Sequence, residues 1–172
     1  MSSFRRVWQM PSSDTFDVPA IGALVRKYLL GVSVDPFSRN KRWATYTNDL
    51  NPATEAEYHM HAEDFLVMLA DRGVVADVVI FDPPYSPTQM KECYDFEGAP
   101  QHGMNSKLYA DCRTAIRRLC KHGTLVLSFG WNSAGMGSGF SLEELLLVCH
   151  GGAHNDTICI VERMQEEQTS LI

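Results

Sequence analysis

The chain has 172 residues, with 15 Lys and Arg against 21 Asp and Glu, which gives a formal net charge of −6 with neutral histidines. Hydrophobic residues make up 45% and charged residues 21%, the balance of an ordinary globular protein. This length fits one domain with a full core, which excludes a disulfide-stabilised mini-protein and a fibrous repeat. The acidic balance excludes a basic protein that coats nucleic acid.

The first half of the chain alternates β-like and helical runs, a pattern typical of a mostly parallel sheet. After an irregular start, Asp17 is expected to cap a helix that has Pro19 in its first turn and ends at Gly31. Further along come, in order, a strand over 32–34, a strand over 44–47, and a helix that carries Phe65 and stops at Gly73.

The second half begins with a continuous apolar run over 78–81, typical of a strand buried on both faces. Ser141 with Glu144 matches the capping box of a short helix. The other predicted elements are a long loop over 86–105, a helix capped by Ser106, a strand over 124–129, a glycine-rich loop over 130–139, a closing antiparallel hairpin of 145–149 with 157–161, and a polar tail over 162–172.

The cysteines and the lack of long apolar runs indicate the cellular compartment of the protein. None of the five cysteines forms a CxxC pair, so we expect buried free thiols in a reducing compartment. A membrane helix needs about 20 apolar residues, far more than any run here. No secretory signal follows Arg5-Arg6. We therefore expect a cytoplasmic protein with no membrane partner.

The most informative tetrapeptide is Asp82-Pro83-Pro84-Tyr85, directly after the apolar run. Loops at the carboxyl ends of parallel strands face the crevice where open α/β sheets bind ligands. Two consecutive prolines fix the backbone and remove two donors, so carbonyl oxygens are left pointing outward. These oxygens and the Asp82 carboxylate can accept hydrogen bonds from a flat exocyclic amine, while Tyr85 stacks on the ring that bears it. The alternative is a proline-rich turn after a core strand.

This tetrapeptide matches all four positions of [D/N/S]-P-P-[Y/F/W], the active-site motif of the S-adenosylmethionine-dependent amino-methyltransferases, chiefly the DNA adenine-N6 enzymes. Over roughly residues 10–163 the chain resembles this family, and more closely its small orphan members of phage type. The resemblance implies a Rossmann-like α/β fold: a mostly parallel, seven-stranded sheet with a terminal antiparallel hairpin. It implies a single methyltransferase domain over 1–172, without a separate target-recognition domain, in a bacterial or phage-infected cell.

The resemblance also implies the reaction, a methyl transfer to an exocyclic amine, adenine N6 in DNA. The catalytic residues would be Asp82, Pro83, Pro84 and Tyr85. Asp82 and the carbonyl of Pro83 would accept the two hydrogens of the amine, and Tyr85 would stack on the extruded base. The rate would then come mostly from positioning the two reactants.

The cofactor, S-adenosyl-L-methionine, would be held at two further strand ends. Asp49, flanked by Asn48 and Leu50, is expected to bind the ribose hydroxyls, because one carboxylate can accept two hydrogen bonds from a diol. The alternative for this segment is a turn and helix cap. His61 and Ala62 stand where the family contacts the adenine of the cofactor.

The first family motif departs from its usual form. Where the family has F-x-G-x-G, this chain has Asp35, Pro36 and Phe37, without the glycines that let the backbone approach the cofactor. We expect Asp35 to pair with the ammonium group of the cofactor instead. The segment containing Thr15 and Phe16 resembles the family segment that closes over the methionine carboxylate, and Asp82 would line the same site.

Trp131 and Asn132 follow a strand end on the crevice side and are candidate substrate contacts. The indole can stack on a flipped base or on the cofactor, and packing within the loop is the alternative. Because sequence readout needs base-edge contacts, so short a chain would act with little specificity, as a homodimer, or with a partner subunit. The basic clusters over 39–42 and 113–121 are a local basic rim or a solvated face. We expect no metal site, since no spacing matches a structural zinc pattern.

Three alternative functions stay open at this point. The same fold could act on cytosine N4, on RNA adenine or on a protein amide. The missing glycines also fit a lyase or hydrolase that acts on the cofactor alone. The third alternative is a non-catalytic binding or structural subunit that docks on a partner.

Overall fold

The structure is a computed structural model, which describes residues 2–85, 89 and 106–165. One seven-stranded sheet has the order β1-β6-β7-β5-β4-β2-β3. The strands are β1 (Ser3–Trp8), β2 (Ser33–Asp35), β3 (Tyr46–Thr47), β4 (Ala76–Phe81), β5 (Cys120–Gly130), β6 (Phe140–Cys149) and β7 (Thr157–Met164). The helices are the 3₁₀ turn η1 (Thr15–Asp17), α1 (Pro19–Tyr28), α2 (Ala62–Asp71) and α4 (Ser106–Leu119).

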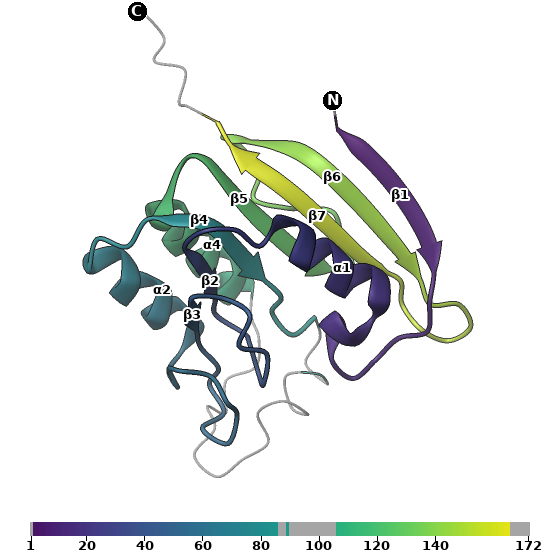
Figure 1. The fold of residues 1–172 in the computed structure, drawn as a ribbon, viewed down its shortest axis with the longest axis horizontal. Helices are drawn as coiled ribbons and strands as arrows, with labels where there is room; N and C mark the ends of the chain where they lie inside the picture. The colour runs from purple at the N-terminus through teal and green to yellow at the C-terminus, as the bar shows by residue number, and fades with distance from the viewer. Residues whose placement is uncertain (1, 86–88, 90–105, 166–172) are drawn as a thin grey trace, which may run out of the picture.

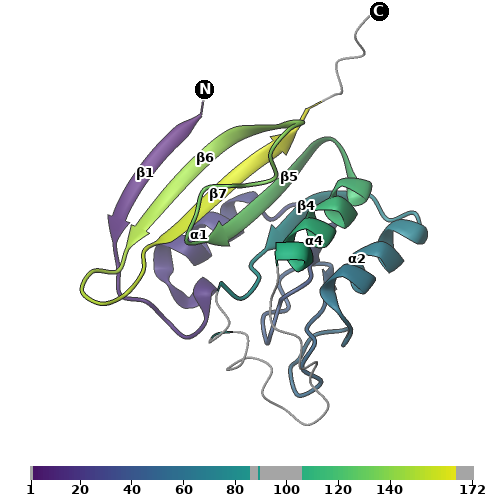
Figure 2. The ribbon, with the colours of Figure 1, turned by 180° about the vertical axis from the view of Figure 1, so that it is seen from behind.

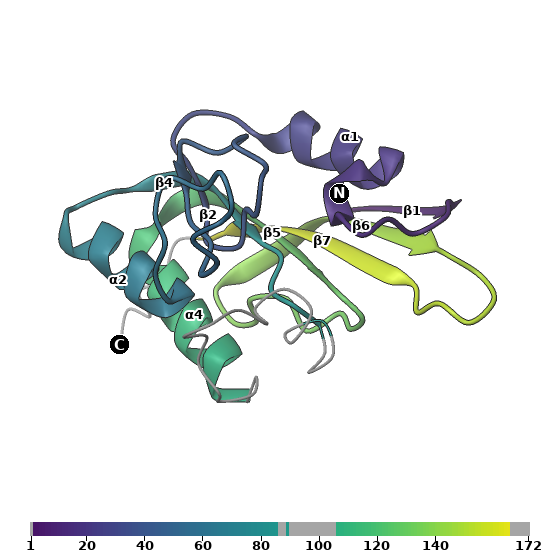
Figure 3. The same cartoon turned by 90° about the horizontal axis from the view of Figure 1, so that it is seen from below.

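The sheet has the predicted mixed character. Neighbouring strands are parallel except for β7, which runs antiparallel to both β5 and β6. Helix α1 lies on one face of the sheet, and α2 and α4 lie on the other (Figures 1 and 2). The view from below shows these layers edge-on (Figure 3). The prediction of a mostly parallel sheet closed by an antiparallel hairpin is therefore confirmed.

Strand β4 explains how the two cores are built. Its side chains alternate, so that Val78 and Ile80 join the core under α1 while Val79 and Phe81 join the core under α2 and α4. All four are at most 3% exposed. A strand covered on both faces reads as an unbroken apolar run, which is why the sequence identified it.

The start of α1 differs from the prediction by one residue. Asp17 belongs to η1, and Val18 is the residue before the helix, with Pro19 in the first turn. The carboxylate that caps is Asp14, whose Oδ1 accepts the N–H of Phe16 at 3.1 Å. The extra 3₁₀ turn moves the cap upstream.

Three further predictions are wrong. The irregular start is strand β1, which pairs in parallel with β6 at the edge of the sheet. Ser141 and Glu144 do not begin a helix, because β6 runs through both. The predicted polar tail also begins too early, since residues 162–164 belong to β7 and Glu162 is buried. The loop predicted over 86–105 lies outside the described residues except for Gln89, as do residues 166–172.

Strand β6 carries an acidic residue, Glu144, on its buried face, and three neighbouring side chains make its burial possible. It is 1% exposed, and its carboxylate accepts hydrogen bonds from Arg5 Nε at 2.8 Å, Lys27 Nζ at 2.6 Å and Tyr28 Oη at 2.9 Å. Burial raises the pKa of Glu144, but the hydrogen bonds from Lys27, Tyr28 and Arg5 together outweigh it, so that the pKa is lowered. This carboxylate therefore joins β1, β6 and α1.

Replacing this carboxylate is expected to destabilise the fold in a pH-dependent way. A Glu144→Gln variant should lose about 1–3 kcal/mol of unfolding free energy at pH 7, because charge-assisted bonds to a buried group are lost. A carboxyl group with a lowered folded pKa stabilises above its unfolded pKa, and this contribution disappears as the pH falls through the folded value. Urea unfolding at pH 7 and at about pH 3 tests this.

The neighbouring Glu143→Gln variant is the matched control. Glu143 pairs with Arg163 at 2.7 Å, but both side chains are more than a third exposed. Such a surface pair contributes about 0–1 kcal/mol. Equal stability of the two variants at pH 7 would contradict the role assigned to Glu144.

Within the described part of the chain, no helix has the length and apolar character needed to cross a membrane.

Candidate functional site

Three acidic residues meet at the carboxyl ends of adjacent parallel strands. Asp35 ends β2, Asp49 follows β3 and Asp82 follows β4. Because β2 pairs with both β3 and β4, these ends lie at one edge of the sheet. This is the place where open α/β sheets bind ligands. The sequence predicts this grouping, and in the structure the charges of Asp82 and Asp49 both act on Asp35.

Asp82 is half-buried, and Tyr85 of the same tetrapeptide contacts it directly. The hydroxyl of Tyr85 donates a hydrogen bond to Asp82 Oδ1. Burial raises the pKa of Asp82 to about 6, and hydrogen bonds from Tyr85 and Thr15 oppose the rise. Burial and the adjacent Asp82 charge raise the pKa of Tyr85 well above its ordinary value, so the phenol stays protonated as the donor. The pair therefore presents a carboxylate held in place by a neutral hydroxyl.

The backbone of this corner is fixed from outside the motif. Tyr109, on α4, donates a hydrogen bond from its hydroxyl to the carbonyl of Pro84 at 2.6 Å. The side chain of Gln89 accepts the N–H of Tyr85 at 2.6 Å. Among the described residues, no donor contacts the carbonyl of Pro83. The two prolyl carbonyls thus differ: that of Pro84 accepts from Tyr109, whereas that of Pro83 has no donor in the described part of the chain.

Asp35 is almost completely buried at 1% exposure. Its Oδ1 accepts the N–H of Phe37 at 3.0 Å. Burial raises the pKa of Asp35 well above its ordinary range, and the charges of Asp82, Asp49 and Asp14 add to the rise. A cation nearby would stabilise the charged form of this group, because its attraction offsets both the desolvation cost of burial and the repulsion from the neighbouring carboxylates.

Asp49 is also 1% exposed, and backbone amides hold it. Its two oxygens accept the N–H of Asn51 at 2.9 Å and the N–H of Arg39 at 3.1 Å. Burial still raises its pKa, in spite of these bonds and of the Arg39 charge. Each carboxylate oxygen keeps a second lone pair, so Asp49 can accept further bonds.

The residues around Asp49 serve the fold itself. Asn48 donates from its amide to the carbonyls of Pro36 at 3.1 Å and Met60 at 3.0 Å, and its Oδ1 accepts the N–H of Met60 at 3.1 Å. These bonds join the ends of β2 and β3 to the bridge that Asn48 forms with Tyr58. Leu50 follows, half-buried. The amide of Asn48 therefore supports the position of Asp49.

The other residues predicted to bind a cofactor lie in different surroundings. Pro36 is buried, and Phe37 packs against Phe81 with ring centroids 6.0 Å apart. Ala62 is buried at the first position of α2, whereas His61 before it is exposed and makes no side-chain cap bond. The structure thus brings Pro36 and Phe37 close to Asp35, while His61 faces solvent.

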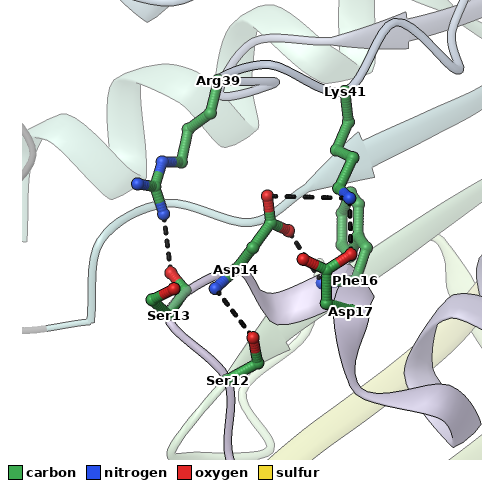
Figure 4. A network of polar contacts seen from close by, with 7 residues as sticks. All are labelled: Ser12, Ser13, Asp14, Phe16, Asp17, Arg39 and Lys41. Carbon is green, nitrogen blue, oxygen red and sulfur yellow. Dashed lines mark hydrogen bonds and ion pairs between the residues drawn. The ribbon is translucent and has the colours of Figure 1, made fainter.

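The segment before α1 is attached to the loop after β2 by basic side chains (Figure 4). Arg39 Nη1 donates to the carbonyl of Ser13 at 2.6 Å. Lys41 Nζ lies 2.5 Å from Asp17 Oδ1 and 4.0 Å from Asp14 Oδ2. Within the basic cluster over 39–42, Arg39 and Lys41 therefore attach this segment, and Arg42 is exposed.

Within this segment, Thr15 and Phe16 have separate places. Thr15 is half-buried and hydrogen bonds to Asp82 strongly enough to affect its pKa. Phe16 is 6% exposed and packs between Trp43 and Phe129, with ring centroids at 5.7 Å and 5.3 Å. Phe16 is thus a core anchor, and Thr15 is the residue that faces the site.

A cavity of about 170 Å³ opens beside Tyr85. Trp131 is 40% exposed on its wall, with its ring edge-to-face to Tyr85 at 5.8 Å. Asn132 is exposed, and its Oδ1 accepts the N–H of Ala134 at 3.0 Å, within its own turn. The other lining residues are Pro11, Ser12, Ser13, Thr15, Val18, Ile21, Gln89, His150, His154, Asn155 and Thr157. The structure therefore groups Trp131 with Tyr85 and leaves Asn132 apart.

The turn between β6 and β7 supplies polar groups that the sequence analysis did not name. His150 is 7% exposed, and its Nδ1 lies 2.7 Å from the carbonyl of Gln9. A carbonyl only accepts, so Nδ1 carries a proton, and Nε2 of the same ring lies 2.9 Å from the Thr157 hydroxyl. Both His150 and Thr157 line the cavity.

Across the described residues, no three His, Cys, Asp or Glu side chains are grouped as metal ligands would be.

No protein-family model matches the chain, and no curated protein matches it. Solved structures do. A protein from Streptococcus mutans, assigned as a SAM-dependent methyltransferase, has a TM-score of 0.57 at 13% identity over 87% of this chain and 49% of its own. TrmN from Thermus thermophilus has a TM-score of 0.55 at 16% identity, over 89% of this chain and 50% of its own.

A third solved structure, SMU.776, is assigned as a methyltransferase and was crystallised with SAH. Its TM-score is 0.54 at 13% identity, over 77% of this chain and 44% of its own. The chain therefore spans about half the length of each of these three solved proteins. These likenesses show the fold, a Rossmann-like α/β sheet of the kind found in these proteins.

Proposed function

We propose that this chain is an S-adenosylmethionine-dependent methyltransferase that transfers a methyl group to an exocyclic amine, adenine N6 in DNA. The observation that carries the proposal is the corner formed by Asp82, Pro83, Pro84 and Tyr85. It holds a carboxylate and a prolyl carbonyl that no described residue donates to, next to a cavity lined by Tyr85 and Trp131. Both the fold and the three solved proteins assigned or named above support this reading.

The donor set fits a cationic cofactor with a ribose. Asp35 and Asp82 are carboxyl groups whose burial raises their pKa, and a positive charge beside them would relieve that cost. Asp49 keeps acceptor capacity for a diol. Thr15 and the backbone of the segment before α1 offer donors and acceptors at the same edge. When bound there, the cofactor would supply an electrophilic methyl group on a sulfonium.

The residues of this chain then orient the acceptor. Asp82 and the carbonyl of Pro83 accept the two hydrogens of the amine, which turns the nitrogen lone pair away from them. Tyr85 holds the Asp82 carboxylate through its hydroxyl, and its ring forms one wall for the heterocycle. Trp131, edge-on to Tyr85, extends that wall. Holding two reactants in this way accounts for most of the rate in such a displacement.

Transfer of tritium from methyl-labelled S-adenosylmethionine tests the proposal. The chain is incubated with unmethylated DNA, RNA or protein, and the products are also analysed without any acceptor. We expect label in DNA, recovered as N6-methyladenine. Label in RNA or protein would overturn the DNA acceptor, and cofactor breakdown without acceptor would show a lyase or hydrolase. No binding of the cofactor in calorimetry would overturn the whole proposal.

We further propose that a second copy or a partner subunit takes part in holding DNA. The net charge of −6 gives little attraction to phosphates, which supply most non-specific affinity. Light scattering on the chain alone and with a DNA duplex tests this. A monomer that binds DNA tightly at physiological salt would contradict it.

Tyr109→Phe is expected to lower kcat by about fivefold, because the loss of one neutral hydrogen bond costs about 1 kcal/mol. The variant frees the carbonyl of Pro84, which then competes with that of Pro83 for the amine, while the ring keeps its edge contact with Phe81 at 6.3 Å. The affinity for S-adenosylmethionine should not change. Steady-state kinetics and calorimetry measure both values.

Tyr46→Phe serves as the control, since Tyr46 is half-buried in β3, on the other side of β2 from the corner. A Tyr109→Phe variant with the kcat of the unaltered chain would show that the Pro84 contact plays no part in transfer. A parallel loss of melting temperature and cofactor affinity would show that Tyr109 only stabilises the fold.

A further inference from the structure

Arg39 has an unusual backbone for its residue type. Its φ is +49°, and among the described residues it is the sole non-glycine residue with positive φ. For a residue with a long side chain this left-handed conformation is uncommon and costs energy. Residues held in this way persist where the surrounding structure requires them, and they concentrate at functional sites. The side chain is exposed, so core packing does not explain the conformation.

Two bonds of Arg39 reach two parts of the candidate site. Its backbone N–H donates to Asp49 Oδ2 at 3.1 Å. Its guanidinium donates to the carbonyl of Ser13 at 2.6 Å, as Figure 4 shows. One residue in the loop after β2 therefore contacts both the carboxylate at the end of β3 and the segment before α1.

Lys41 adds a second attachment to the same segment. Its ammonium group pairs with Asp17 at 2.5 Å and lies 4.0 Å from Asp14. It also lies 5.7 Å from the ring centroid of Trp43, which stacks on Phe16. Such exposed ion pairs contribute little by themselves and weaken with salt. The contact made by Arg39 differs, because the same residue also donates its backbone N–H to Asp49.

The segment that Arg39 holds carries groups that act on Asp82. Thr15 hydrogen bonds to Asp82 and lowers its pKa, whereas the charge of Asp14 raises it. The charge of Arg39 itself lowers the pKa of both Asp82 and Asp49. Movement of this segment would therefore change the surroundings of the corner without touching the corner residues.

We propose that Arg39 is a positioning residue that holds residues 12–17 against the ends of β2 and β3. Through its guanidinium it keeps Thr15 beside Asp82, and through its backbone it aims the carboxylate of Asp49. The inference rests on the proposed function only for the identity of the molecule enclosed there, S-adenosylmethionine. The left-handed backbone of Arg39 is the cost of making both contacts from one position.

The Arg39→Gly variant distinguishes the role of the side-chain bond to Ser13 from the role of the backbone conformation. Glycine adopts positive φ without penalty and keeps the N–H that Asp49 accepts, but it removes the bond to Ser13. We expect the melting temperature of the variant without ligand to stay within about 3 °C, because relief of the backbone offsets the lost bond. The affinity for S-adenosylmethionine in calorimetry should fall about tenfold, the effect of losing one charge-assisted bond.

Amide hydrogen exchange gives a readout that does not need the cofactor. The N–H groups of Phe16, Asp17 and Val18 bond to Asp14 or Thr15 within the held segment. In Arg39→Gly we expect these amides to exchange about tenfold faster, since the segment opens more often. Amides of the β4 core should exchange as before.

Arg42→Gly is the matched control, with the same charge change at an exposed position of the same loop. Its affinity and exchange should equal those of the unaltered chain. Unchanged exchange and affinity in Arg39→Gly would overturn the inference, and so would a loss of affinity accompanied by a large drop in melting temperature. If the unaltered chain binds no S-adenosylmethionine, the proposed function fails, and the exchange experiment still decides the role of Arg39.

Discussion

Asp82→Asn is expected to reduce methyl transfer by about 10²–10³-fold, the usual effect of removing one preorganised charged contact from an active site. The amide keeps the size of the side chain and can still accept the hydroxyl of Tyr85. It loses the charge that orients the amine, and its NH₂ group faces the hydrogens of that amine. Affinity for S-adenosylmethionine should change far less than the rate. Labelled transfer and calorimetry on the same preparation measure both.

The pH dependence of methyl transfer by the unaltered chain also tests the role of Asp82. Burial raises the pKa of Asp82 to about 6, so transfer should rise as the pH passes through 6 and the carboxylate ionises. The raised pKa means that the folded protein binds this proton more tightly than the unfolded chain, and ionisation therefore costs stability above the unfolded pKa. Asp82→Asn removes that cost, so its melting temperature at pH 7.5 should equal or exceed that of the unaltered chain.

Asp71→Asn provides the control. Asp71 is an exposed residue at the end of α2 that pairs with Arg118 at 2.5 Å. Both side chains are about half exposed or more, so little stability or activity should depend on this pair. An Asp82→Asn variant that transfers methyl groups as fast as Asp71→Asn would show that the corner is not the acceptor site.

A second large effect is expected in the discrimination between cofactor and product. S-adenosylmethionine carries a sulfonium charge, and S-adenosylhomocysteine does not. Burial raises the pKa of Asp82 to about 6, so this group ionises as the pH rises from 5 to 8. Burial also raises the pKa of Asp35 and of Asp49. The preference for the charged form should therefore be small at pH 5 and grow to about tenfold or more at pH 8, since one pKa unit of coupling corresponds to a factor of ten.

Calorimetry with both ligands at the two pH values measures this preference. Binding of the cation lowers the pKa of the carboxyl groups and releases protons, which repeat titrations in buffers of different ionisation enthalpy detect. Asp82→Asn removes the group placed beside the sulfonium and should reduce both the preference and the proton release. A ratio that stays constant from pH 5 to pH 8 would contradict an acidic site for the sulfonium.

Much of the fold could be predicted because burial follows sequence in the centre of the sheet. Strand β4 is covered on both faces, so its apolar run identifies it, and the carboxylates at the ends of β2, β3 and β4 then fall at one edge. The motif after β4 needed no tertiary information. For these reasons the position of Asp35, Asp49 and Asp82 could be inferred from the chain alone.

The edge of the sheet could not be predicted in the same way. Strand β1 is exposed along most of its length and carries Arg5 and Arg6, so its pattern is that of a polar terminus. In β6 the spacing of Ser141 and Glu144 matches a helix capping box although both residues lie in a strand. The carboxylate of Glu144 can be buried there because three side chains donate hydrogen bonds to it. In both cases a long-range contact outweighs the local pattern.

The supporting residues of the site also depend on long-range contacts. Tyr109 reaches Pro84 from α4, Arg39 reaches Ser13 from the loop after β2, and His150 reaches Gln9 from the turn before β7. Each pair is far apart in sequence, and no local spacing relates the two partners. The backbone conformation of Arg39 likewise leaves no trace in composition or periodicity.

The most direct test of the central claim is a crystal structure of the chain with S-adenosylhomocysteine bound. The account predicts that the ribose hydroxyls contact Asp49 and that the sulfur faces the space bounded by Asp82 and the carbonyl of Pro83, with the cavity beside Tyr85 open next to it. A ligand bound on another surface, or a corner covered by other side chains when the ligand is present, would contradict the account.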